Sequence, residues 1–124
     1  MTQSNTVIAV LDDLFFNVKI ADAAKRAGFQ VVFVKTPAAA KARLKEAPAL
    51  MIVDLNCSAL DPIQLVSEIK NGEFRQIPVI GYVSHVQVEL RQKAQDAGCD
   101  VVLARSAVDS KLPQLLAQRR VETS

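Results

Sequence analysis

Residues 50–62 read LMIVDLNCSALDP and carry the clearest signature of the architecture. The segment opens with an apolar run, typical of a strand buried on both faces of a parallel sheet, and the run ends at Asp54. An earlier apolar run at residues 7–11 ends in Asp12 and Asp13. Because the carboxyl ends of parallel strands lie at one edge of a sheet, we expect these carboxylates to lie close together. An apolar strand gains nothing by ending in unpaired charge, so the acids indicate a site for a hard cation or a phosphoryl group.

Outward from this segment, the chain alternates between five short β-rich runs and five segments with helical spacing. The expected strands are residues 6–11, 30–35, 50–54, 77–83 and 100–104. Capping residues predict helix starts at Asp13, Thr36, Asp61 and Ser84, and a fifth helix is expected from about Ser110 to Arg120, with Pro113 in its first turn. No linker, repeat or low-complexity stretch divides residues 1–124. The alternation therefore predicts a single α/β domain, a doubly wound five-stranded parallel sheet in three layers (α/β/α).

The composition excludes several classes of function. The net charge is +2 and the basic residues are dispersed, whereas nucleic-acid binders show a concentrated basic face. No apolar run approaches the ~20 residues that span a bilayer, and the polar residues 1–6 do not resemble a signal peptide, so a cytoplasmic location is expected. Cys57 and Cys99 are expected to be reduced structural thiols, because neither lies at metal-ligand spacing from the single histidine, His85.

With the acidic strand ends and the five βα units in place, the whole chain resembles a response-regulator receiver domain of two-component signalling. Counting on from Asp12 reaches Gly28, where receivers end their first helix, and the Asp-Gly of the family appears here as Asp61-Pro62. The resemblance implies a flavodoxin-like sheet with strand order 2-1-3-4-5. It also implies a role in phosphorelay signal transduction.

The resemblance implies that Asp54 is the phosphoacceptor and that Asp12 and Asp54 bind a divalent cation, with Asp13 as a further candidate ligand. Leu11 stands where the family has the first acid of its pair, so only weak Mg²⁺ binding is expected. Arg105 stands at the position of the family's lysine and keeps the positive charge. Asp12 and Asp13 also fit a simpler interpretation, as the cap of the first helix and a partner of its dipole.

The positions that relay phosphorylation in the family are altered. Val83 replaces the switch hydroxyl and Val102 replaces the switch aromatic ring, which leaves no evident moving part. Ser84 is interpreted either as a helix cap or as a substitute for the missing hydroxyl. His85 is either a solvated loop residue or a gate over Asp54. Asn56 either tunes the lifetime of a phosphoryl group, as the resemblance implies, or bonds its own loop backbone.

Two hypotheses of function follow. The first is a receiver that still accepts a phosphoryl group at Asp54. The alternative is a pseudo-receiver, a phosphate-independent protein-interaction module. The expected partner is a sensor histidine kinase or another signalling protein, docked through the first helix or through the face formed by the fourth helix, fifth strand and fifth helix. The same face is the expected contact of a homodimer. A nucleotide or cofactor site is not expected, since no glycine follows the first strand, and neither is an enzyme with turnover.

Overall fold

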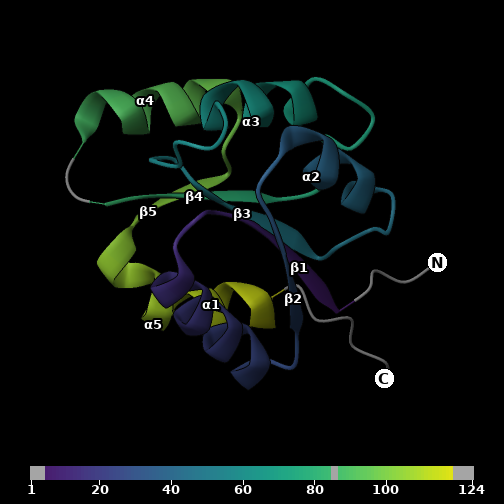
Figure 1. The fold of residues 1–124 in the computed structure, drawn as a ribbon, viewed down its shortest axis with the longest axis vertical. Helices are drawn as coiled ribbons and strands as arrows, with labels where there is room; N and C mark the ends of the chain where they lie inside the picture. Colours follow the sequence, from purple (N-terminus) through teal and green to yellow (C-terminus); the bar gives the residue numbers. More distant parts are fainter. Residues whose placement is uncertain (1–4, 85–86, 119–124) are drawn as a thin grey trace.

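The computed structural model describes residues 5–84 and 87–118, in which five parallel strands form one sheet (Figure 1). The strands are β1 (Thr6–Val10), β2 (Gln30–Val34), β3 (Leu50–Asp54), β4 (Val79–Val83) and β5 (Val101–Ala104). Their order in the sheet is β2-β1-β3-β4-β5. The predicted fold class and strand order are therefore confirmed.

Five helices connect and cover the strands, namely α1 (Leu14–Arg26), α2 (Pro37–Leu44), α3 (Pro62–Lys70), α4 (Val88–Ala97) and α5 (Arg105–Ala117). Helices α1 and α5 lie on one face of the sheet, and α2, α3 and α4 lie on the other (Figure 1). Each face buries its own apolar cluster, which accounts for the near-continuous apolar character of the central strands. No helix within residues 5–84 and 87–118 is both long and apolar enough to cross a bilayer.

Three helices begin where capping residues predicted. The Asp13 carboxylate accepts hydrogen bonds from the backbone N–H groups of Phe15 and Phe16, at 3.0 and 3.1 Å. Thr36 caps α2 through its hydroxyl and Asp61 caps α3 through its carboxylate, each accepting the N–H three residues on. Each cap satisfies backbone donors that the first turn of a helix leaves without an internal partner.

The starts of the last two helices differ from the prediction. Helix α4 begins at Val88 after Gln87, so the interpretation of Ser84 as its cap is wrong. Helix α5 begins at Arg105, directly after β5, so Pro113 lies inside this helix and not in its first turn. The reason is tertiary packing. Val108, which precedes Pro113, is buried together with later apolar residues of the helix, so the helical segment begins well before the proline that locally indicates a helix start. The predicted end at Arg120 lies outside the described residues.

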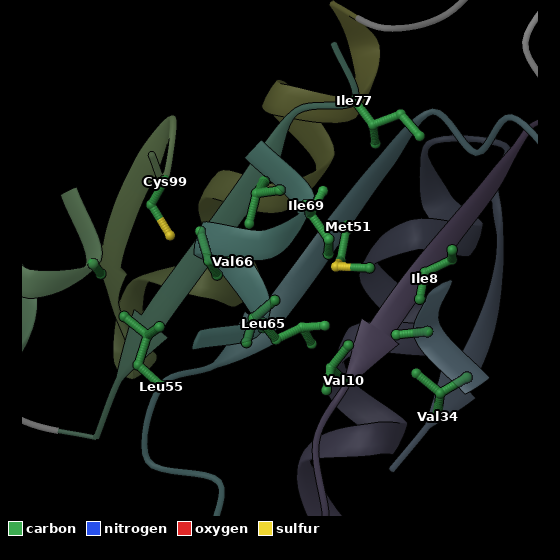
Figure 2. Packing of buried hydrophobic residues seen from close by; sticks show 14 of the residues in the cluster. Ile8, Val10, Val34, Met51, Leu55, Leu65, Val66, Ile69, Ile77 and Cys99 are labelled. Carbon is green, nitrogen blue, oxygen red and sulfur yellow. The ribbon is translucent and has the colours of Figure 1, made fainter. Parts of the chain in front are cut away.

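Gly81 lets the segment after Asp54 pack tightly against β4. A Cβ atom at Gly81 would come within 2.8 Å of Leu55 Cδ1 and 3.1 Å of Cys99 Sγ. Leu55 and Cys99 belong to the apolar cluster between the sheet and the α2, α3 and α4 layer (Figure 2). Leu55 thus takes the space that a side chain on β4 would otherwise fill, which anchors the loop that carries the candidate site.

Candidate functional site

The carboxyl edge of the sheet, where β1, β3 and β4 end, carries the candidate site. The register pairs Val10 with Val53 and Asp54 with Tyr82, so Asp54 is flanked by Tyr82 on β4 and by Leu11, the residue directly after β1. Leu11 is 1% exposed and packs in the apolar cluster beneath α1 and α5. The position after β1 that lies level with Asp54 is therefore apolar core, and Asp12 and Asp13 follow it in the chain.

Asp54 is a partly buried carboxylate at the end of β3. One of its oxygens, Oδ1, accepts a hydrogen bond of 2.8 Å from the backbone N–H of Asn56. Burial raises the pKa of Asp54 above its ordinary value, while that hydrogen bond and the positive charge of Arg105 act in the opposite direction. The nearby negative charge of Asp13 adds to the increase. The charges of Arg105 and Asp13 thus both act on the pKa of Asp54, although Asp54 forms no ion pair within the described part of the chain.

Asp13 is held by bonds to both of its carboxylate oxygens. Oδ1 caps α1, and Oδ2 accepts a hydrogen bond from Nη2 of Arg105. These bonds, the one from the Phe16 N–H foremost, hold the pKa of Asp13 below its ordinary value although burial opposes them. Asp13 therefore serves as the cap that the simpler interpretation predicted and as the partner of a cation as well.

Asp12 points to a different partner. Its Oδ1 lies 3.5 Å from Nζ of Lys35, at the residue after β2, and both side chains are at least half exposed. Adjacent acids thus pair with cations on opposite sides of β1, Lys35 in one direction and Arg105 in the other. Asp13 and Arg105 thus contact each other and both act electrostatically on Asp54, whereas Asp12 pairs with Lys35 at the surface.

Arg105 is the first residue of α5, and it follows Ala104, which pairs with Val83 at the end of β4. Its guanidinium carbon lies 4.5 Å from the centroid of the Phe16 ring, a cation–π geometry. Arg105 therefore contacts both the N-cap of α1, through the Asp13 carboxylate, and the helix itself, through the face of Phe16.

Ser84 and Asn56 join the two loops over the site. Oδ1 of Asn56 accepts hydrogen bonds from both the backbone N–H and the hydroxyl of Ser84, at 2.8 and 3.1 Å. Asn56 thus bonds across to the loop after β4 and not to its own loop backbone through its side chain. Ser84 is exposed, and its hydroxyl is directed to this amide. His85, the predicted gate, lies outside the described residues.

The two relay positions are packed in the core. Val83 is 4% exposed and Val102 is 5% exposed, and both belong to the cluster under α2, α3 and α4. The carbonyl of Val102 accepts a hydrogen bond of 3.2 Å from Nη2 of Arg91, which ties α4 to β5. Neither side chain carries a polar group that could respond to a charge at Asp54.

The sequence reading missed an exposed apolar surface at the start of α1. Leu14, Phe15 and Val18 are 75%, 88% and 69% exposed, and we call these three residues the α1 patch. A cavity of about 400 Å³ lies beside it, lined by Phe15, Phe16, Lys19, Ser84, Arg105 and Ser106. The signal was available in the spacing i, i+1, i+4 of apolar residues on the face of α1 opposite the buried Phe16 and Ile20.

As they are arranged, these residues offer a divalent cation few uncommitted oxygens. Hard cations need several oxygen ligands, yet both oxygens of Asp13 are engaged, Asp12 is turned to Lys35, and Asp54 Oδ1 accepts the Asn56 N–H. Across residues 5–84 and 87–118 no three His, Cys, Asp or Glu side chains are grouped so that they could hold a metal ion.

No protein-family model matches the chain, and no curated protein matches it. Solved structures do match along nearly its whole length. The phosphorylated cyanobacterial phytochrome response regulator RcpA is 22% identical with a TM-score of 0.74, covering 93% of this chain and 90% of that one. The chemotaxis response regulator CheY4 of Vibrio cholerae is 18% identical with a TM-score of 0.78, covering 96% of this chain and 100% of that one.

A third match is the receiver domain of the sensor histidine kinase PA1611 from Pseudomonas aeruginosa, solved with a magnesium ion coordinated in its active site cleft. It is 20% identical with a TM-score of 0.79, covering 95% of this chain and 97% of that one. At these identities the likeness establishes the fold, which is that of response-regulator receiver domains, as the sequence resemblance predicted.

Proposed function

We propose that this chain is a receiver-type signalling module that acts by binding a partner protein, with an output that does not depend on phosphorylation of Asp54. This is the pseudo-receiver hypothesis. The observation that carries it is the α1 patch, since three large apolar side chains at 69–88% exposure on one helix start are typical of an interaction surface. The proposal assigns no catalytic turnover to the chain.

The surroundings of the α1 patch suit a helical partner. The cavity beside Phe15 offers room for one large apolar side chain, and Lys19 and Arg105 line the same cavity. An amphipathic helix with apolar residues at i, i+3 and i+4 and acidic neighbours complements such a surface. We therefore propose a helix of a sensor histidine kinase, or of another two-component signalling protein, as the occupant, which places the chain in the cytoplasm.

The buried relay positions support an output without phosphorylation. A phosphoryl group shifts a receiver when a polar or mobile side chain follows it, whereas Val83 and Val102 are apolar, β-branched and closely packed. A homodimer through α4, β5 and α5 stays a prediction, and Val88, 72% exposed at the start of α4, would be its natural apolar contact.

Phosphoryl transfer to Asp54 is the second candidate function. Asp54 lies partly exposed at the strand end, and its Oδ2 accepts no hydrogen bond from any residue that the structure describes. Incubation with acetyl phosphate and Mg²⁺, followed by intact-mass measurement, tests this candidate. A mass increase of one phosphoryl group that is lost in Asp54→Asn would establish it, and weak Mg²⁺ dependence is the expected accompaniment.

The proposed function is tested by locating the contact with the partner and measuring how much it contributes to the affinity. A photoreactive benzoylphenylalanine in place of Phe15 captures the partner in cells, mass spectrometry identifies it, and its affinity for purified variants is then measured. Val18→Ser is expected to weaken binding about tenfold, because it removes apolar area from the contact. Val88→Ser is the matched control, since it makes the same change at an equally exposed valine on α4.

Asp54→Asn is expected to leave the affinity unchanged. The proposal fails if Asp54→Asn abolishes binding, or if Val88→Ser weakens it while Val18→Ser does not. The second outcome would move the contact to the face of α4, β5 and α5.

A further inference from the structure

We propose that Arg105 is a built-in cation, which takes the place of a divalent metal ion at the carboxyl edge and competes with such an ion for the Asp13 carboxylate. This inference deepens the proposed function, because an edge whose acids are already neutralised by the chain itself needs no metal to be stable. It concerns metal binding alone, so its test is separate from that of partner binding.

The first support is that both carboxylate oxygens of Asp13 already accept hydrogen bonds from the chain itself. Its Oδ1 accepts two backbone N–H groups, and its Oδ2 accepts Nη2 of Arg105. A metal ion that approached Oδ2 would meet the positive guanidinium of Arg105 on the same oxygen, and Oδ1 is committed to the cap of α1. Charge-assisted bonds from a guanidinium to a carboxylate are among the stronger hydrogen bonds in proteins, which makes Arg105 a real competitor.

The second support is that Arg105 is fixed from several directions. It occupies the first position of α5 immediately after β5, and its guanidinium carbon lies 4.5 Å from the Phe16 ring centroid. Phe16 also donates its backbone N–H to Asp13. One residue of α1 thus supports both the cation and its carboxylate, so the pair is positioned before any ligand arrives.

The third support is the charge around the site. Asp12, Asp13 and Asp54 carry three negative charges when ionised, and Lys35 and Arg105 each pair with one of these acids. The charge of Arg105 also extends to Asp54, whose pKa it lowers against the larger effect of burial. A doubly charged ion would therefore meet a single uncompensated carboxylate, where three free acids would have attracted it strongly.

The experiment is a titration with MgCl₂ followed by ¹H–¹⁵N NMR of the backbone amides near the site, such as Phe15 and Asn56. The wild type is expected to bind weakly. Arg105→Gln frees Asp13 Oδ2 and removes a repelling charge, so the affinity for Mg²⁺ is expected to rise about tenfold or more. Arg26→Gln is the matched control, because Arg26 also pairs with carboxylates across α1 and α5, at 3.2 Å from Asp22 and from Asp109.

A second variant identifies the ligand that is gained. Asp13→Asn combined with Arg105→Gln is expected to return the affinity to the wild-type level, because the released carboxylate is gone. If Arg105→Gln does not fold, Arg105→Lys keeps the charge but loses the planar fork, and a smaller gain in affinity is expected.

The inference is overturned if Arg105→Gln and Arg105→Lys bind Mg²⁺ no more tightly than the wild type and Arg26→Gln. It is also overturned if the gain survives Asp13→Asn. Neither result would alter the effect of Val18→Ser on partner binding, so this inference and the proposed function fail independently.

Discussion

Asp13 and Asp54 lie at the same sheet edge, yet their surroundings shift their pKa values in opposite directions. Burial is the main influence on the pKa of Asp54 and raises it, whereas backbone N–H donors are the main influence on the pKa of Asp13 and lower it. The two residues therefore contribute to stability with opposite signs at neutral pH. Single substitutions separate the two effects.

Asp54→Asn is expected to stabilise the fold by about 0.5 kcal/mol at pH 7, a modest value because the group is partly exposed and screened. Since the folded pKa is raised, the ionised form is disfavoured in the folded state, and this penalty develops as pH rises from the ordinary value of 3.8 through the folded pKa. The amide keeps an oxygen for the Asn56 N–H. Urea unfolding at several pH values measures the difference.

The gain from Asp54→Asn should disappear below about pH 3.8, where the aspartate is neutral in both states. A loss of stability at pH 7 would instead show that the carboxylate has a stabilising partner in the folded protein.

Asp13→Ala is expected to destabilise the fold by about 2 kcal/mol, of which about 1 comes from the helix cap and up to about 1 from the ion pair with Arg105. Asp61→Ala is the control, because Asp61 caps α3 in the same way and has no ion pair among the described residues. Since the folded pKa of Asp13 is lowered, its contribution is present above the ordinary value of 3.8 and is lost as pH falls through the folded pKa. Equal costs for the two variants would show that the Arg105 pair contributes nothing to stability.

At the scale of elements, helix caps explain which boundaries were predictable. Three caps use a side chain that accepts a backbone N–H two or three residues further on, namely Asp13, Thr36 and Asp61. Because both partners lie close in the chain, the local sequence is enough to predict these helix starts. Ser84 carries the same chemistry, but its amide and hydroxyl bond to Asn56, 28 residues earlier in the chain. A cap is a local contact, and a loop-to-loop bond is not visible in sequence spacing.

The contact of Leu55 with Gly81 links the loop after Asp54 to β4. Gly81→Ala is expected to cost about 1–3 kcal/mol, because its Cβ would lie 2.8 Å from Leu55 Cδ1 and 3.1 Å from Cys99 Sγ. In a Leu55→Ala background the closest contacts are removed and the 3.1 Å approach to Cys99 Sγ remains, so the same change should cost markedly less. Chemical denaturation of the two single variants and the double variant gives the coupling energy.

Additive costs in this cycle would contradict the packing described for Leu55 and Gly81. Cys99→Ser in place of Leu55→Ala serves as the control, since it leaves the crowding by Leu55 unchanged.

At the scale of the whole molecule, the cluster of charges at the carboxyl edge and the two relay valines lie on opposite faces of the sheet. The acids and Arg105 border the α1 and α5 layer, and Val83 and Val102 pack on the opposite side with the α3 and α4 cluster. Arg91 further holds α4 to the carbonyl of Val102 at 3.2 Å. A signal at Asp54 would thus have to cross the sheet through closely packed valines.

Beryllofluoride with Mg²⁺, a mimic of the acyl phosphate, is therefore expected to leave the amide resonances of α4 and β5 in place. Any changes should be confined to residues near Asp54, because Val83 offers no hydroxyl to follow the ligand. ¹H–¹⁵N spectra with and without the ligand provide the measurement, and Asp54→Asn is the control for specific binding. Shifts that spread through α4 and β5 would favour the phosphorylation-dependent receiver instead.

The sequence sufficed for the class of fold, the strand order by resemblance, and the placing of Asp54 at a strand end, since hydrophobic periodicity and helix caps act over a few residues. The partners of the acids came only from the folded chain. Asp13 meets Arg105 across 92 residues, and Asp12 turns to Lys35 although it is the neighbour of Asp13. Ion pairs of this kind depend on the direction in which each side chain leaves its loop, and packing between distant elements sets that direction. The same holds for the α1 patch, because the exposure of an apolar side chain depends on which face of its helix the sheet and α5 cover.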